Sequence, residues 1–87
     1  MAGTELWIGI DVGKRSHHAC AIDHTGTVVW SRRVDNDQTA IDALLRSVDG
    51  ADVRWAVDLT SAVASLLLTL LAAADQRVVY IPGRVVH

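Results

Sequence analysis

Two aspartates, Asp11 and Asp58, are the side chains best placed to carry chemistry, because each directly follows a short apolar segment. These segments, residues 6–10 and 53–57, have the length and composition of buried β-strands. If the strands are neighbours, both carboxylates lie at the same edge of an α/β sheet, where such sheets bind ligands. Neighbouring carboxylates repel unless a cation or a proton lies between them. Their hard oxygen atoms suit Mg²⁺ or Mn²⁺, and such ions can orient a phosphate for phosphoryl transfer.

An aspartate at a strand end also has a structural explanation, since it often begins a turn or caps the next helix. For Asp11, which precedes Val12 and Gly13, a turn is a direct alternative to a metal site. Lys14 and Arg15 come next and can contact phosphates beside the metal. A solvated basic pair on a loop has the same composition, so both interpretations of these two residues stay open.

Other polar and aromatic residues are interpreted as structural. His17 and His18 are adjacent in a predicted strand and point to opposite faces, so they cannot easily chelate one ion. Cys20 lies within the same apolar strand and is expected in the core. Three predicted strands each carry a tryptophan, and these are also expected to pack in the core: Trp7, Trp30 and Trp55.

Hydrophobic periodicity predicts five strands and two helices. The strands are expected at residues 6–10, 18–22, 27–30, 53–57 and 77–81. The first helix is expected to carry Ile41, Leu44, Leu45 and Val48 on one apolar face, and the second to run from Thr60 or Ser61 to about Ala74. Asn36 or Asp37 is expected to cap the first helix, and Gly50 to follow its end. The order is βββαβαβ, and a right-handed crossover makes the fourth strand parallel to the first. The fold class is therefore α/β, with a mixed five-stranded sheet in the order 3-2-1-4-5.

The second predicted helix is apolar on every side, with only Ser65 and Thr69 polar across residues 62–74. Such a helix needs cover beyond its sheet-facing side. No other predicted element remains to supply it, so we expect cover from a missing portion of the chain or from a partner subunit.

Composition narrows the class of protein. The chain has 87 residues, 51% of them hydrophobic, and a formal net charge of −2. This fits one small folded domain and excludes a disordered chain. The single Cys20 excludes an internal disulfide and a zinc site of several cysteines. There is no secretory signal pattern, and the longest apolar stretch falls short of the about 20 residues that span a bilayer. We expect a soluble, cytoplasmic protein with no membrane partner.

Four segments in this order resemble the amino-terminal domain of IS110-family transposases: WIGIDVGK (7–14), DHTG (23–26), WAVDLTS (55–61) and VVYIPGRVV (78–86). The resemblance implies an RNase H-like, RuvC-type fold. It also implies four acidic residues, a DEDD set, that bind Mg²⁺ or Mn²⁺ while DNA strands are cut and rejoined. Asp11 matches the first acid, and Asp58 matches the second, where the family usually has Glu before Thr-Gly. Asp75 stands where the family often has a glycine at the end of the second helix.

The resemblance further implies that residues 1–87 form a partial domain without its carboxyl-terminal part. The third and fourth acids, and a second domain with a nucleophilic serine, belong beyond His87 in the family. DNA at the element ends and target, a guide RNA and a homo-oligomer are the implied partners. With half of the acidic set missing, we expect that this chain alone does not cleave DNA.

Two alternatives remain at this point. Residues 8–13 also resemble the opening of actin-like ATPases and sugar kinases, although Lys14 and Arg15 intervene before the first hydroxyl residue, Ser16. The other alternative is a non-catalytic module that dimerises through its apolar second helix.

Overall fold

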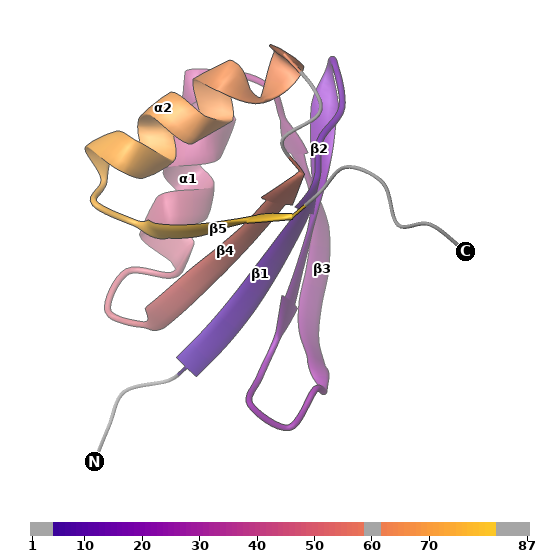
Figure 1. The fold of residues 1–87 in the computed structure, drawn as a ribbon, viewed down its shortest axis with the longest axis vertical. Coiled ribbons are helices and arrows are strands. Elements are labelled where there is room, and N and C mark those ends of the chain that lie inside the picture. The colour runs from indigo at the N-terminus through magenta and orange to yellow at the C-terminus, as the bar shows by residue number, and fades with distance from the viewer. Residues whose placement is uncertain (1–4, 59–61, 82–87) are drawn as a thin grey trace.

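The computed structural model describes residues 5–58 and 62–81 of the chain. Within them the βββαβαβ order is confirmed (Figure 1). The elements are β1 (Glu5–Asp11), β2 (Ser16–Ile22), β3 (Val28–Asp35), α1 (Gln38–Ser47), β4 (Asp52–Asp58), a 3₁₀ turn η1 (Ala62–Ala64), α2 (Ser65–Ala73) and β5 (Arg77–Ile81).

The strands form one mixed sheet in the order β3-β2-β1-β4-β5, as predicted. β1 pairs antiparallel with β2 and parallel with β4, while β5 continues the sheet parallel to β4. This is the topology of an RNase H-like fold, and it places β1 and β4 side by side in the middle of the sheet.

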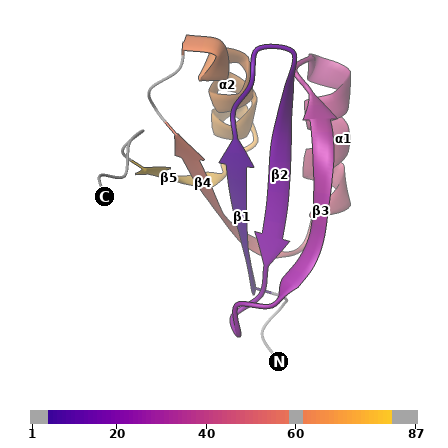
Figure 2. The same ribbon diagram turned by 90° about the vertical axis from the view of Figure 1, so that its right-hand side faces the viewer.

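Both helices cover the same face of the sheet (Figures 1 and 2). The crossover from β3 through α1 to β4 and the crossover from β4 through α2 to β5 advance in the same direction across the sheet. Because such crossovers are right-handed, both helices must lie on one side. The opposite side, which we call the open face, carries no described helix and includes Trp7, Gly9 and Asp11 of β1.

Strand alternation divides the side chains between these two faces. Ile8 and Ile10 of β1 and Trp55 and Val57 of β4 are buried beneath the helices. The indole N–H of Trp55 donates a hydrogen bond of 2.8 Å to Oε1 of Gln76, so this core tryptophan has its polar atom satisfied.

Three of the predicted core residues are only partly buried. Cys20 and Trp7 are half-buried on the open face rather than beneath the helices. Trp30 is half-buried against the edge of the core, with the Arg32 guanidinium 4.2 Å from its ring centre. The prediction failed at Cys20 and Trp7 because an apolar run does not reveal that one sheet face lacks helices, whereas Trp30 does pack against the core from the edge strand β3.

The first helix follows the predicted pattern closely. Asp37 is its N-cap, and Oδ1 of this residue accepts the Ala40 N–H at 2.8 Å. Ile41 and Leu44 are buried, which confirms the predicted apolar face. Gly50 has the positive φ of +88° expected after the helix end.

The hairpin between β2 and β3 turns at Asp23 and Gly26. Asp23 Oδ1 accepts the main-chain N–H groups of Thr25 and Thr27 at 2.9 and 3.1 Å. A hydrogen bond from the Thr25 hydroxyl, the largest contribution, helps hold the pKa of Asp23 below its ordinary value.

The second helix is covered within the chain to a greater degree than predicted. Leu67 and Leu71 are buried, and Leu66, Leu68 and Leu70 are partly buried against the core. The additional cover comes from α1, which packs beside α2. The predicted caps Thr60 and Ser61 lie outside the described residues, and α2 itself begins at Ser65. None of the described helices is long and apolar enough to cross a membrane.

The end of α2 is a left-handed turn at Asp75, with φ of 58°. The Asp75 N–H donates to the Ala72 carbonyl and the Gln76 N–H to the Leu71 carbonyl, both at 3.0 Å. This pair of bonds is a Schellman motif, whose left-handed position favours glycine. The turn also directs Gln76 toward the Trp55 indole, so it connects α2 to the centre of the sheet.

Replacing Asp75 should therefore stabilise the protein. Asp75→Gly removes a side chain from a left-handed position and a negative charge from a helix C-terminus, and we expect the free energy of unfolding to rise by about 1 kcal/mol. Asp75→Asn removes only the charge and should give about half of this gain. Urea denaturation of both variants measures the difference, and a loss of stability in Asp75→Gly would contradict the strained turn.

Candidate metal and nucleic-acid site

The two candidate acids lie next to each other in the sheet. The parallel register of β1 and β4 runs to Ile10 opposite Val57, and Asp11 and Asp58 are the next residue of each strand. Adjacent strands are about 4.8 Å apart, so the backbones of the two aspartates are neighbours at the carboxyl ends of β1 and β4. The structure brings the predicted pair together at the level of the strands, while the side chain of Asp58 lies outside the described residues.

Asp11 is exposed on the open face, because Ile10 before it points into the core. Among the described residues, none donates a hydrogen bond to its carboxylate or forms an ion pair with it. The Asp11 oxygens are therefore available to an external cation or donor.

A row of polar residues crosses the open face from Asp11. Asp11 is opposite His18 of β2, and His18 is opposite Arg33 of β3. These three side chains contribute to the wall of a shallow depression of about 220 Å³, whose other lining residues are Val12, Gly13, Ser16 and His17. The row thus places an acid beside an imidazole and a guanidinium on one surface.

The two histidines point to opposite faces, as predicted. His18 is exposed on the open face, where its Nε2 lies 2.5 Å from the Ser31 hydroxyl. His17 is buried on the helix side, with 2% of its surface exposed. The two side chains therefore do not share an ion.

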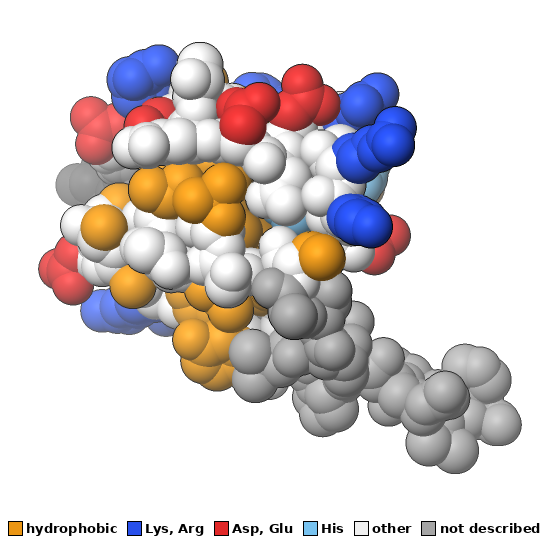
Figure 3. Space-filling view, turned by 90° about the horizontal axis from the view of Figure 1, so that it is seen from above, with side chains coloured by type: hydrophobic (Ala, Val, Ile, Leu, Met, Phe, Trp, Pro, Cys, Tyr) orange, Lys and Arg blue, Asp and Glu red, His pale blue; other side chains and the backbone are white. Residues whose placement is uncertain are grey.

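Lys14 and Arg15 lie in the connection between β1 and β2, three and four residues after Asp11, and both are exposed. The view from above shows a group of Lys and Arg side chains at one end of the molecule, beside a histidine, and further basic side chains elsewhere on this face (Figure 3). Arg33 is also exposed, and its Nε lies 3.4 Å from Asp35 Oδ1. Basic residues therefore lie near Asp11 along the chain and, through Arg33, on β3, although the chain as a whole is weakly acidic.

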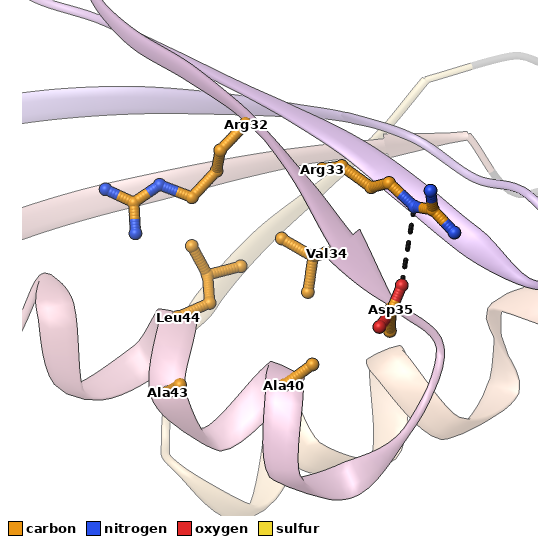
Figure 4. Close-up of a pocket in the computed structure, with 7 residues that line it drawn as sticks. All are labelled: Arg32, Arg33, Val34, Asp35, Ala40, Ala43 and Leu44. Carbon is orange, nitrogen blue, oxygen red and sulfur yellow. Dashed lines mark ion pairs between the residues drawn. The ribbon is translucent and has the colours of Figure 1, made fainter.

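Arg33 and its neighbour Arg32 have different environments. Arg32 points toward Leu44 of α1 and lines a groove of about 490 Å³ between β3 and α1, whereas Arg33 turns toward Asp35 (Figure 4). Arg32 is also the residue stacked on Trp30. Of these two arginines, only Arg33 lines the depression beside Asp11.

The acids fit part of a divalent metal site. Aspartate supplies the oxygen ligands that Mg²⁺ prefers, and Mg²⁺ usually retains several waters. Within residues 5–58 and 62–81, no three His, Cys, Asp or Glu side chains group closely enough to hold a metal on their own.

Comparison with known proteins identifies the family. The DEDD_Tnp_IS110 family model, described as a transposase, matches residues 8–87. The chain belongs to the IS110 family of transposases. Its relatives include the 42 kDa protein of insertion element IS900 from Mycobacterium paratuberculosis, 44% identical over 86 residues, which cover 94% of this chain and 22% of the relative. The 44.8 kDa protein of insertion element IS116 from Streptomyces clavuligerus is 43% identical over 83 residues, which cover 94% of this chain and 21% of the relative.

A third relative is the 43.6 kDa protein of insertion element IS110 from Streptomyces coelicolor, 28% identical over 80 residues. The IS110-family match lies in the amino-terminal portion of these proteins, and the chain spans about a fifth of their length. Family membership favours the transposase over the actin-like ATPase alternative.

Sequence reasoning did not identify Arg33 of this IS110-family chain as a site residue. Arg33 is far from Asp11 in the sequence, and the two meet only through the register of three strands. The alternation of inward and outward side chains along β2 and β3 could have placed His18 and Arg33 on the same face. Using it requires the strand register, that is, which residues are opposite each other.

Gly13 allows the close turn that follows Asp11. A Cβ at this position would overlap the Ser16 carbonyl oxygen, whereas a Cβ at Gly9, on the open face of β1, would meet no atom within 4 Å. We expect Gly13→Ala to lower the free energy of unfolding by about 1–3 kcal/mol through this overlap. Gly9→Ala, the matched control, should raise it by about 0.5 kcal/mol. Urea denaturation measures both, and equal stabilities would contradict the tight turn.

Proposed function

We propose that residues 1–87 form part of the RNase H-like catalytic domain of a DNA transposase, in which Asp11 and Asp58 bind Mg²⁺ or Mn²⁺. The observation that supports this assignment is the parallel register of β1 and β4, which makes the two aspartates neighbours at the sheet edge. Membership in a transposase family supports the same chemistry.

The chain's own residues would bind and orient the DNA backbone. Asp11 and Asp58 would hold the divalent ion, which would polarise and orient a phosphate for phosphoryl transfer. Asp11 offers a carboxylate that no described residue engages. Lys14, Arg15 and Arg33 supply positive charge beside it, where phosphates on either side of the reacting group can be held.

The complete reaction is proposed for the longer protein. This chain spans about a fifth of its relatives, so we infer that the rest of the acidic set and the second, serine-bearing domain lie outside it. These 87 residues alone are therefore not expected to cleave DNA. DNA is the proposed partner of the parent transposase, with a guide RNA and self-association proposed on the family resemblance alone. Dimerisation through α2 has little support, because α1 and the sheet already cover much of that helix.

Metal binding can be tested by thermal unfolding with and without MnCl₂. Wild-type protein should be stabilised, by about 1.4 kcal/mol when Mn²⁺ is at ten times its Kd. Asp11→Asn should abolish this response, because an amide oxygen carries no charge to hold the ion.

A matched control exists at the other end of the same two strands, where Glu5 is opposite Asp52 and forms a second acidic neighbour pair. Asp52→Asn should leave the Mn²⁺ response unchanged. If Asp52→Asn abolishes the response and Asp11→Asn does not, the ion binds at the wrong edge and the proposal is incorrect. Turnover by the 87-residue chain in a nicking assay with Mn²⁺ would likewise contradict the partial-domain assignment.

DNA binding can be tested through its dependence on salt, using fluorescence anisotropy with a labelled duplex of arbitrary sequence. Each lost phosphate contact should reduce the slope of log K against log[salt] by about 1. We expect this reduction for Lys14→Ala, Arg15→Ala and Arg33→Ala. Arg46→Ala removes an equal charge from the last turn of α1, away from the depression, and should not change the slope. Equal effects from Arg46 and Arg33 would indicate unspecific attraction.

A further inference from the structure

His17 is the only polar residue buried in the core among the described parts of the chain. A buried imidazole without partners is destabilising, since its nitrogens lose their bonds to water. Here both ring nitrogens have partners. Nδ1 lies 3.2 Å from the Gly13 main-chain nitrogen, and Nε2 lies 3.0 Å from Asn36 Oδ1.

The direction of these bonds follows from the groups involved. The Gly13 N–H can only donate, so Nδ1 of His17 must accept and carry no proton. The proton of the neutral ring is then on Nε2, which donates to Asn36 Oδ1. The Asn36 amide is oriented consistently, because its Nδ2 donates to the Lys14 carbonyl at 3.1 Å.

The network fixes the loop that carries the basic residues. The main-chain N–H of Asn36 also donates to the Arg15 carbonyl at 2.9 Å. Gly13, Lys14 and Arg15 therefore each have one main-chain group bonded to His17 or Asn36. We call these two residues the loop clamp. The clamped segment begins two residues after Asp11, and Gly13 passes so close to the Ser16 carbonyl oxygen that a Cβ would overlap it.

We propose that the loop clamp, His17 and Asn36, is a positioning device that holds Lys14 and Arg15 beside Asp11 to receive the DNA phosphate backbone. This role rests on the proposed function, because it requires that the Asp11 edge binds DNA. His17 and Asn36 act through the loop's main chain and do not themselves contact the phosphate. The Lys14 and Arg15 side chains remain exposed and free to do so.

The clamp itself can be observed without DNA or metal. In ¹⁵N NMR spectra of the wild-type chain, the His17 imidazole should show the tautomer protonated at Nε2. The Gly13 amide should exchange with solvent about fivefold faster in His17→Phe, which keeps a ring in the core but removes both nitrogens. Protonation at Nδ1 in the wild type, or unchanged Gly13 exchange in the variant, would overturn the clamp.

The positioning role is tested by comparing variants in DNA binding. Asn36→Leu provides a variant that leaves the buried ring in place, in case His17→Phe does not fold. Both should bind a labelled DNA duplex about fivefold more weakly than wild type, with a smaller salt slope. Val34→Ala, at the buried β3 residue opposite His17, is the control, since it removes core packing but no loop bond. It should bind DNA as the wild type does.

Two different results would overturn the positioning role of the loop clamp, and they distinguish its failure from failure of the proposed function. If Asn36→Leu and a folded His17→Phe bind DNA no more weakly than Val34→Ala, the loop clamp does not position the basic residues even though DNA binds. If wild-type protein shows the expected tautomer but binds neither Mn²⁺ nor DNA, the proposed function fails and the positioning role fails with it, while the clamp stands as a structural feature.

Discussion

The parallel pairing of β1 with β4 is the interaction on which the rest of this structure depends. It joins two segments separated by two strands and a helix, and closing so long a connection costs conformational entropy. Burial offsets that cost, since Ile8 and Trp55 are opposite each other in the register and both are fully buried. The same register brings Asp11 beside Asp58. The packing that stabilises the crossover therefore also makes the backbones of the two aspartates neighbours.

Because both helices lie on one face of the sheet, the residues that form the core and the candidate site residues lie on opposite faces. Residues such as Ile8, Ile10 and Val57 face the helices and form the core. The residues that alternate with them face the other way, where Arg54 lies 5.6 Å from the Trp7 ring and the row from Asp11 to Arg33 crosses the strands. Strand alternation places Arg33 on the same face as Asp11 and Arg32 on the helix face, so a basic residue lies near Asp11 in a chain of net charge −2.

Local patterns predicted most of the fold. The strand order follows from five apolar segments and the handedness of crossovers, and Asp37 and Gly50 were recognised because caps have clear residue preferences. The misassigned residues depend on tertiary structure. Cys20 and Trp7 lie in apolar strands, but only the arrangement of the helices shows that their face is open. Likewise, α2 packs beside α1, and the hydrophobic periodicity of each helix alone does not predict this contact.

The same distinction applies to the candidate site. Asp11, Lys14 and Arg15 lie within five residues of the sequence, so their proximity was predictable, while Arg33 joins them only through two strand pairings. His17 shows why a buried polar residue is informative. An apolar side chain would fill its place without the risk of an unsatisfied nitrogen, a penalty of roughly 1–3 kcal/mol. In this fold both nitrogens are used: Nδ1 bonds the loop after Asp11 at Gly13, and Nε2 bonds Asn36, whose amide bonds the same loop at Lys14. The network therefore restricts the loop in a way that apolar packing, which is non-directional, would not.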